Sequence, residues 1–413
     1  MTARSLALSA VVIAFVTALG AGMAHAQDFL PPEEMATHAI DTHPLTSKGW
    51  SSVHAAEAEA KKLDVGEYEY TVETSHAGRD IDQSGQYHEW DAGVSRAIRL
   101  PGKADLDTQT GALGVQSQKA SFDGTRHQVA VMLLESWIAW LQAEALAAID
   151  RSEVENWRTE QNIMARRVAA RDAAQLDLDE IGAMLARATG TATLSAGKAK
   201  EAKSALRRQF PDLAIPATAP VITPPQKPER PFAEWFDILR SHNDELRAAE
   251  LEAQRLDTVA KRKARDQWAD PSVGVKYFSE RGGAETGVGI TLSMPIGGDY
   301  RSAVTDVSNA EASSGWAAVH NARQEADRLA DQVIIRAETS FENWQQSAAA
   351  LAASDEVRKK SRRSFEVGQQ SLSDFLLAAR LYYESERSEL QSRADAQQYL
   401  TRLKIDAREL WIR

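Results

Sequence analysis

The sequence contains no cysteine and only nine histidines. Without cysteine, disulfide bonds, thiolate metal sites and thiol catalysis are all excluded. The histidines are scattered and no His-x-x-x-His pair occurs, so we predict neither a metal site nor a cofactor. Basic residues are also outnumbered by acidic ones, with 48 Lys and Arg against 59 Asp and Glu and a formal net charge of −11. This balance disfavours nucleic acid as a partner.

Long apolar runs are confined to the N-terminus, and the mean hydropathy is −0.40. Residues 1–26 are predicted to be a secretory signal peptide, since Arg4 precedes an apolar run and Ala24-His25-Ala26 fits a cleavage site. The alternative is a membrane anchor. Cleavage would leave Gln27 first, so a lipid anchor on an N-terminal cysteine is not expected. No later segment is expected to span a bilayer as a helix.

The chain repeats one pattern at an offset of 194 positions (288 − 94). Residues Val94–Gly102 align with Val288–Ile296, and both runs alternate and end near a proline. Each leads into a long helical stretch that breaks near Ala174 in the first copy and near Gly368 in the second. We therefore predict one duplicated unit and not several unrelated domains. The units are 27–210 and 232–413, joined by a proline-rich connector at 211–231, which cannot be helical.

Each copy contains a predicted β-hairpin, at about 66–100 and about 271–296. The four strands have roughly nine to thirteen residues, the length needed to cross a bilayer as tilted strands. Residues Gly78 to Gly85 are predicted to be a polar turn, and Arg281-Gly282-Gly283 the second turn. One face of the strands is apolar, with Arg96 interrupting it; its members are Tyr68, Tyr70, Val72, Trp90, Ala92, Val94, Ile98 and Leu100, then Val273, Val275, Tyr277, Val288, Ile290, Leu292 and Met294.

The stretches after the strands are predicted to be helical hairpins, at about 103–210 and about 302–412. Pro101 to Glu180 and Pro295 to Asp374 both span 79 positions (180 − 101 and 374 − 295). A helix of about 65 residues would be close to 100 Å long. Narrow apolar seams along these stretches favour coiled-coil packing. Four strands cannot close a barrel, whereas three chains would supply twelve, so we predict a homotrimer with a polar lumen.

Three motifs then carry a family resemblance: Arg99-Leu100-Pro101-Gly102-Lys103, Pro295-Ile296-Gly297-Gly298, and the stretch from Val367 to Leu376. In their order and spacing the chain resembles the TolC-like outer-membrane efflux proteins over the whole mature sequence, and the first motif is similar to the heavy-metal-efflux branch. The resemblance implies a mainly α fold with paired β-hairpins, forming a trimeric 12-stranded barrel continued by a long α-helical barrel.

The same resemblance implies an outer-membrane protein of a Gram-negative bacterium, in contact with outer-membrane lipid. It implies a passive duct and no enzyme, docking on a periplasmic adaptor protein linked to an inner-membrane pump. The cargo stays open between metal ions, drugs and polypeptides. The alternative functions are a periplasmic coiled-coil adaptor or a scaffold protein of an efflux complex; an adaptor would need further domains around a single hairpin.

Site residues also follow from the resemblance. Adaptor contact is expected at the second tip, through Val367, Gly368 and Leu372, and at the first tip, where Ala173-Ala174 replaces Val-Gly. The alternative for Gly368 is a simple helix C-cap. Asp374 is expected at the pore entrance, with Glu180 as its counterpart in the first copy. The alternative for Asp374 is that it caps the following helix, with Ser371 or Ser373 as the rival cap.

An acidic group is expected on the polar face of the first hairpin. It consists of Glu69, Glu73, Glu89 and Asp91, which alternate with the apolar residues. These side chains would line the lumen and favour cations. The alternative is a solvated cluster above the membrane that has no role in selectivity. Trp90 and Trp268 are expected at the membrane interfaces.

Overall fold

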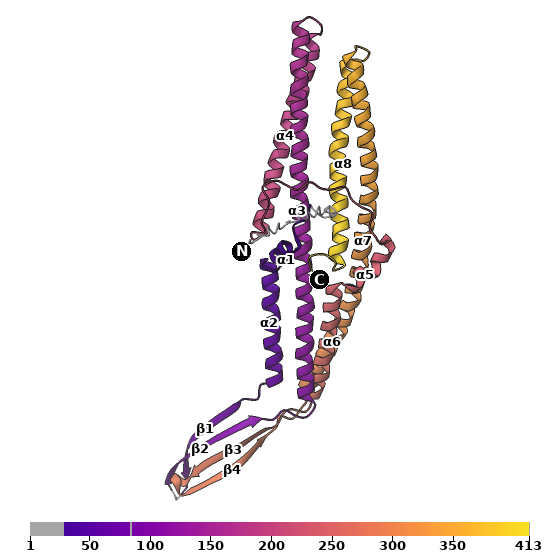
Figure 1. Cartoon of the computed structure of the whole chain (residues 1–413). Coiled ribbons are helices and arrows are strands. Elements are labelled where there is room, and N and C mark those ends of the chain that lie inside the picture. Colours follow the sequence, from indigo (N-terminus) through magenta and orange to yellow (C-terminus); the bar gives the residue numbers. More distant parts are fainter. Residues whose placement is uncertain (1–28, 83–84, 413) are drawn as a thin grey trace, which may run out of the picture.

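The computed structural model describes residues 29–82 and 85–412 of the chain. The predicted signal peptide lies outside these residues. The molecule is long and narrow, with a four-stranded sheet at one end and two helical hairpins at the other (Figure 1).

The sheet contains both hairpins in the order β1-β2-β3-β4, and every neighbouring pair is antiparallel. Its strands are β1 (Tyr70–Ile81), β2 (Gly85–Ala97), β3 (Ser272–Glu280) and β4 (Glu285–Ser293). The two sequence repeats join where β2 pairs with β3, with Val94 opposite Val275. The outer strands β1 and β4 each keep one unpaired edge within the chain.

The first turn is shorter than predicted. Residues Gly78 to Ile81 continue β1 and pair with β2 as far as Gly85. Polar side chains do not end a strand whose backbone ladder continues, and the chain has reversed by Gly85, which pairs with Ile81 and adopts φ +94°. The second turn is where it was predicted, as a 3₁₀ turn, η2 (Arg281–Gly283).

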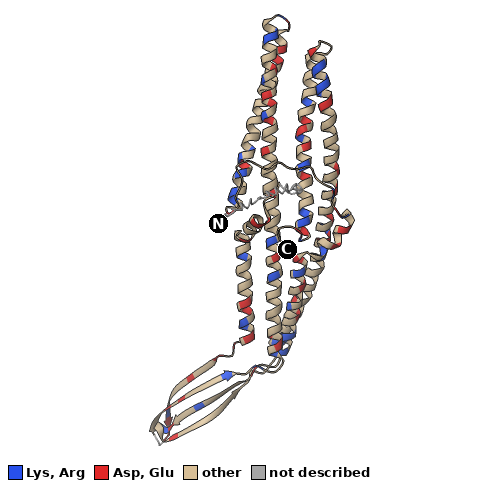
Figure 2. Cartoon of the chain, in the orientation of Figure 1, with Lys and Arg blue, Asp and Glu red and all other residues tan. Residues whose placement is uncertain are grey.

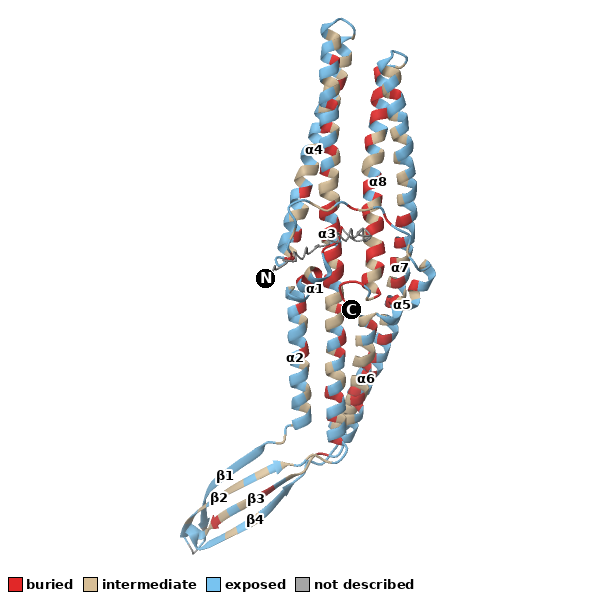
Figure 3. Cartoon of the chain, viewed as in Figure 1, coloured by how far each residue is buried: buried red, intermediate tan, exposed pale blue. Residues whose placement is uncertain are grey.

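The predicted alternation is present in the sheet. Val72 is 70% exposed and Ile290 84% exposed on one side, as are the other large apolar residues of that face (Figure 3). Figure 2 shows that most of the sheet carries no charge. Because successive strand residues point to opposite sides, the acids at Glu73 and Asp91 lie on the other face.

Eight α-helices and the 3₁₀ turn η1 (Phe232–Glu234) are the other helical elements of the described chain. They are α1 (Glu33–Asp41), α2 (Pro44–Val65), α3 (Lys103–Ala169), α4 (Gln175–Gln209), α5 (Trp235–Ser241), α6 (Asp244–Arg265), α7 (Asp299–Glu366) and α8 (Leu372–Asp406). The long helices α3 and α7 have 67 and 68 residues, so each is about 100 Å long. Both lengths agree with the sequence prediction.

The helices form two hairpins, α3 with α4 and α7 with α8, which contact each other through α3 and α8 (Figure 1). Towards the sheet, α2 and α6 replace α4 and α8 beside the long helices. The short helices meet near the middle of the molecule. The ring of His43, just before α2, packs against the ring of Phe210 after α4, with 5.3 Å between the ring centres. Arg408 after α8 pairs with Asp244 at the start of α6.

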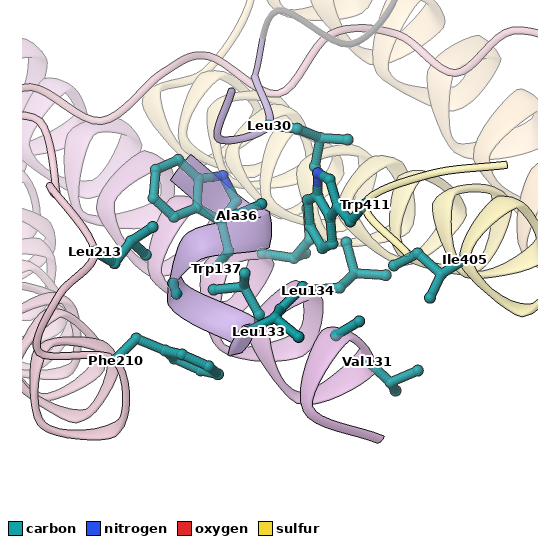
Figure 4. Close-up of a cluster of buried hydrophobic side chains, with 14 of the residues drawn as sticks. Leu30, Ala36, Val131, Leu133, Leu134, Trp137, Phe210, Leu213, Ile405 and Trp411 are labelled. Atoms are coloured by element: carbon teal, nitrogen blue, oxygen red, sulfur yellow. The ribbon is translucent and has the colours of Figure 1, made fainter. Parts of the chain in front are cut away.

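The main core lies at this middle level, and Figure 4 shows part of its buried side chains. Trp137 is 2% exposed, and its indole Nε1 donates to the carbonyl of Phe29 at 2.8 Å. The C-terminal residues Leu410, Trp411 and Ile412 insert into the same cluster. The connector crosses the core without helix, as predicted, and Gln397 of α8 donates to the carbonyl of Thr223 at 2.8 Å.

One helix bears on the expectation that no later segment spans a bilayer as a helix. Among the described residues, α3 is long and apolar enough, by length and composition alone, to cross a membrane, with a mean hydropathy of 1.3 over its best 18-residue window. Half of that window is buried inside the protein. Buried residues of α3 such as Leu133, Trp137 and Leu141 form the middle core, which accounts for their apolar character.

Candidate functional site

The second hairpin tip is a glycine-capped turn. After α7 ends, Gly368 adopts φ +75°, and its amide donates to the carbonyl of Phe365 at 3.0 Å. The next amide, of Gln369, donates to the carbonyl of Ser364 at 2.8 Å. This pair of bonds is a Schellman cap. No described atom lies within 4 Å of the position that a Cβ on Gly368 would take, so glycine is favoured here by backbone conformation alone.

The first tip has the same cap without glycine. Arg171 adopts φ +63°, its amide donates to Val168 at 2.9 Å, and the amide of Asp172 donates to Arg167 at 2.8 Å. Arg171 is therefore the structural counterpart of Gly368. Ala173 and Ala174, predicted as that counterpart, lie further on: Ala173 is half-buried and Ala174 is the residue before α4.

Ala173 and Ala174 were predicted as the counterpart because the offset of 194 between the repeats does not hold at the tips. The strand prolines differ by 194 (295 − 101), but α7 begins 196 positions after α3 (299 − 103) and is one residue longer. The tips are consequently related by 197 (368 − 171). By the same offset Asp177, not Glu180, corresponds to Asp374.

Asp374 and Asp177 have equivalent places in the first turns of their helices. At the second tip the Ser371 hydroxyl contacts an Asp374 carboxylate oxygen at 2.7 Å and accepts from the Asp374 amide at 3.2 Å. At the first tip an Asp177 oxygen accepts from the amide of Ala174 at 3.2 Å. Ser371, one of the two rival caps, is thus the N-cap, and the alternative that Asp374 caps the helix is wrong. Asp374 is exposed and bonded to that cap.

The apolar side chains of the tips mostly pack between the hairpins. Leu372, predicted to contact a partner, is only 7% exposed and lies in a cluster with Trp157, Phe375 and Ile181. Exposed apolar residues of the tips include Val367, 63% exposed, and Leu176, 65% exposed, in the first turn of α4. Sequence reasoning missed Leu176, although an apolar residue directly after a predicted break is a usable signal.

Ion pairs join the two hairpins below the tips. Arg387 of α8 donates to Asp150 of α3 at 2.7 Å and also pairs with Glu153. Nearer the tips, Arg362 of α7 lies 2.7 Å from Glu160 of α3. Burial raises the pKa of Glu160 above its ordinary value, and the Arg362 charge opposes that shift. These pairs were not predicted, because they join residues some 200 positions apart.

The predicted lumenal acids are partly neutralised. The carboxylate of Asp91 lies 3.6 Å from the Lys276 ammonium, and that of Glu89 lies 3.4 Å from Arg79. Glu73 shares the polar face, while Glu69 precedes the first residue of β1. The face is polar, as expected, but less negative than its acids alone suggest.

A further charged cluster lies where the sheet meets the helices. Lys103, 2% exposed, donates to the carbonyl of Trp268 at 2.8 Å, and its ammonium lies 3.0 Å from Asp266 and 2.9 Å from Asp270. These three contacts match the three donors of an ammonium group. Lys103 belongs to the first repeat and its acceptors to the second, so this cluster joins the repeats at the base of the sheet.

Two neighbours complete this cluster. Arg262 donates to Asp107 at 2.7 Å and also pairs with Asp266, and the Tyr68 hydroxyl donates to Asp270 at 2.7 Å. Burial, with the nearby Asp270 carboxylate, raises the pKa of Tyr68 to about 12. Burial alone would raise the pKa values of Asp266 and Asp270 too, but their hydrogen bonds and cationic partners lower both below the ordinary range. Across residues 29–82 and 85–412, no group of three or more His, Asp or Glu side chains is arranged to hold a metal ion.

The chain was compared with known proteins. No family model matches its sequence, and no curated protein does so either. Solved structures match over nearly the whole chain. A membrane protein from Pseudomonas aeruginosa is 17% identical with a TM-score of 0.76, covering 93% of this chain and 95% of that one.

Two named channels match to a similar extent. The CmeC outer-membrane channel of Campylobacter jejuni is 11% identical with a TM-score of 0.76, covering 92% of this chain and 86% of its own. The outer-membrane protein VceC of Vibrio cholerae is 12% identical with a TM-score of 0.74, and the match covers 91% of this chain and 95% of VceC. The chain therefore has the TolC-like fold of these outer-membrane proteins, as its sequence motifs predicted.

Proposed function

We propose that this chain is the outer-membrane channel of a tripartite efflux system, a passive trimeric exit duct. The observation that carries the proposal is the two-sided sheet. One face exposes large apolar residues, such as Val288 at 70% and Ile290 at 84%, while the other carries glycine, hydroxyl and charged side chains. A sheet of this kind matches the wall of a membrane barrel, with lipid outside and water inside.

Trimer formation follows from the strand edges. Within one chain, β1 and β4 each have an unpaired edge, and unpaired backbone groups are not tolerated in lipid. Pairing of β4 with β1 of the next copy, three times over, gives twelve strands and removes every edge. The helical hairpins would continue this barrel as a tube reaching through the periplasm.

Partners are assigned to the tips. A periplasmic adaptor would contact the exposed tip residues Val367 and Gly368, and at the first tip Arg171 and Leu176. An inner-membrane pump joined to that adaptor would supply the energy. The chain itself then needs no catalytic chemistry, and residues 1–26 would direct its export. Asp374 would face the tube entrance.

The alternative of a periplasmic adaptor is less well supported. An adaptor of that type would have one hairpin and further domains around it. Here two hairpins of nearly equal length stand side by side, and the sheet exposes its apolar face.

Adjacent strand residues provide the test. Ile290 points to the apolar face and Thr291 to the polar face of β4. We expect Ile290→Asp to abolish recovery of a heat-modifiable trimer from outer-membrane fractions, because a carboxylate in lipid is costly. Thr291→Asp, the matched control, should still give trimers that conduct ions in planar bilayers. Recovery of the wild-type chain as a soluble periplasmic monomer would overturn the proposal.

A further inference from the structure

Arg96 is a charged side chain on the apolar face of the sheet. In the strand register it lies between Tyr70 of β1 and Val273 of β3. The neighbouring row on the same face contains Val72, Val94 and their partners on β3 and β4. A guanidinium among such residues would be expensive in lipid unless it meets an anion or water.

The protein satisfies only part of this guanidinium. Its Nε donates to the carbonyl of Tyr68 at 2.7 Å, and its central carbon lies 5.0 Å from the centre of the Tyr70 ring. These contacts fix the plane of the group. Within the described part of the chain, neither Nη1 nor Nη2 of Arg96 has an acceptor or an acidic partner. Two parallel donors are left for a ligand from outside.

The site stays open in a closed barrel. β2 is an inner strand of the sheet, so pairing at the edges of β1 and β4 does not cover Arg96. Arg96 lies six positions from Trp90 (96 − 90), which is about 20 Å along the strand. The rings of Trp90 and Tyr277 pack together towards the turn end of the apolar face, with 5.4 Å between the ring centres. Arg96 lies at the opposite, helix-facing end of β2. In the proposed barrel this end would lie at the depth of the headgroups in the periplasmic leaflet.

We propose that Arg96, held by Tyr68 and Tyr70, binds the phosphate of a glycerophospholipid in the periplasm-facing leaflet. This rests on the proposed function, since it requires the apolar face to be in lipid. A guanidinium presents two parallel N–H groups that match two phosphate oxygens, whereas a lysine ammonium acts as a point charge. The acyl chains would lie along the apolar rows of Val94 and Val275.

The experiment uses the full chain, purified as the trimer in mild detergent. Binding of dioleoyl-phosphatidylglycerol is titrated by native mass spectrometry for the wild type, Arg96→Gln, Arg96→Lys and Arg79→Gln. Arg79 is the matched control, an exposed strand arginine that pairs with Glu89 on the other face. Arg96→Gln should weaken binding about tenfold, Arg96→Lys less, and Arg79→Gln not at all.

A second titration uses dioleoylglycerol, which has the same chains and no phosphate. The wild type should bind it no better than Arg96→Gln binds the phospholipid. Equal phospholipid binding by the wild type and Arg96→Gln would overturn the site, as would equal binding of both lipids by the wild type. Either result leaves the channel proposal intact when trimers are recovered from membranes, whereas a failure to insert would overturn that proposal itself.

Discussion

Arg171 and Gly368 hold the same backbone position in the two hairpin tips, at φ +63° and φ +75°, each closing a Schellman cap. A side chain in this left-handed conformation costs about 1 kcal/mol that glycine does not. The two tips therefore differ in strain although their hydrogen bonds match.

Arg171→Gly is expected to stabilise the first tip. Relief of the left-handed strain should raise the local opening free energy by about 1 kcal/mol, so that the amide of Asp172 exchanges about fivefold more slowly. Hydrogen exchange followed by mass spectrometry measures this. Gly368→Ala should have the opposite effect on Gln369. Arg166→Gly, inside α3, serves as the control and should speed exchange because glycine weakens a helix. Faster exchange in Arg171→Gly would contradict the strain argument.

Lys103→Met is expected to be severely destabilising. It keeps the apolar stem but leaves Asp266 and Asp270 without their shared cation in a buried site. Loss of one member of a buried ionic group costs about 3–5 kcal/mol. Urea denaturation of the purified protein measures the change. Lys61→Met, at an exposed position of α2, is the control and should shift stability by less than about 0.5 kcal/mol.

The same cluster should make stability depend on pH. The folded pKa values of Asp266 and Asp270 lie below the ordinary value, so their ionised forms favour the folded state. This contribution is complete above the ordinary carboxyl pKa and is lost as pH falls through the lower folded values. Melting temperatures measured from pH 7 to pH 3 should fall less steeply in Asp270→Asn than in the wild type. An unchanged dependence of the melting temperature on pH would show that Asp270 does not contribute to it.

Arg362 and Glu160 should be energetically coupled. Glu160 is 14% exposed and Arg362 42% exposed, so solvent screens the pair only in part. A double-mutant cycle with Glu160→Gln and Arg362→Gln should give a coupling energy of about 1 kcal/mol. Exchanging the charges, with Glu160→Arg and Arg362→Glu together, should recover part of the stability that either change alone removes. Strictly additive effects would show that the contact contributes nothing.

Trp411→Ala is expected to loosen the middle core. Trp411 is 2% exposed near the end of the chain, and the carbonyl of the same residue accepts from Thr37 at 3.0 Å. Truncation of a buried tryptophan costs about 3–5 kcal/mol, visible as a lower urea midpoint. Trp268→Ala is the matched control, since that side chain is 70% exposed and only its carbonyl meets Lys103. Equal losses in both variants would refute the assignment.

The periodic features of this fold could be predicted from sequence, because period-two and near-3.6 patterns report directly which residues share one face of a strand or a helix. The alternation around Val94 and Val288 and the length of α3 are examples. The tips were misaligned because an offset taken at the strand prolines ignores small changes in loop and helix length. The burial of Leu372 and the pairing of Arg362 with Glu160 depend on how two distant hairpins meet, which no local pattern encodes.

The long helices α3 and α7 pass the middle of the molecule unbroken, whereas α4 stops near α2 and α8 stops near α6. In each hairpin, one helix connects the tip to the sheet without a break. The other helix ends at the middle, where a second, separate helix begins. Twisting a hairpin at its tip would first strain the end of its shorter helix. For α4 this is the contact of Phe210 with His43, and for α8 it is the ion pair of Arg408 with Asp244. We therefore expect a change in the spacing of the tips to leave the sheet end unchanged, because the breaks between α4 and α2 and between α8 and α6 lie between the two ends.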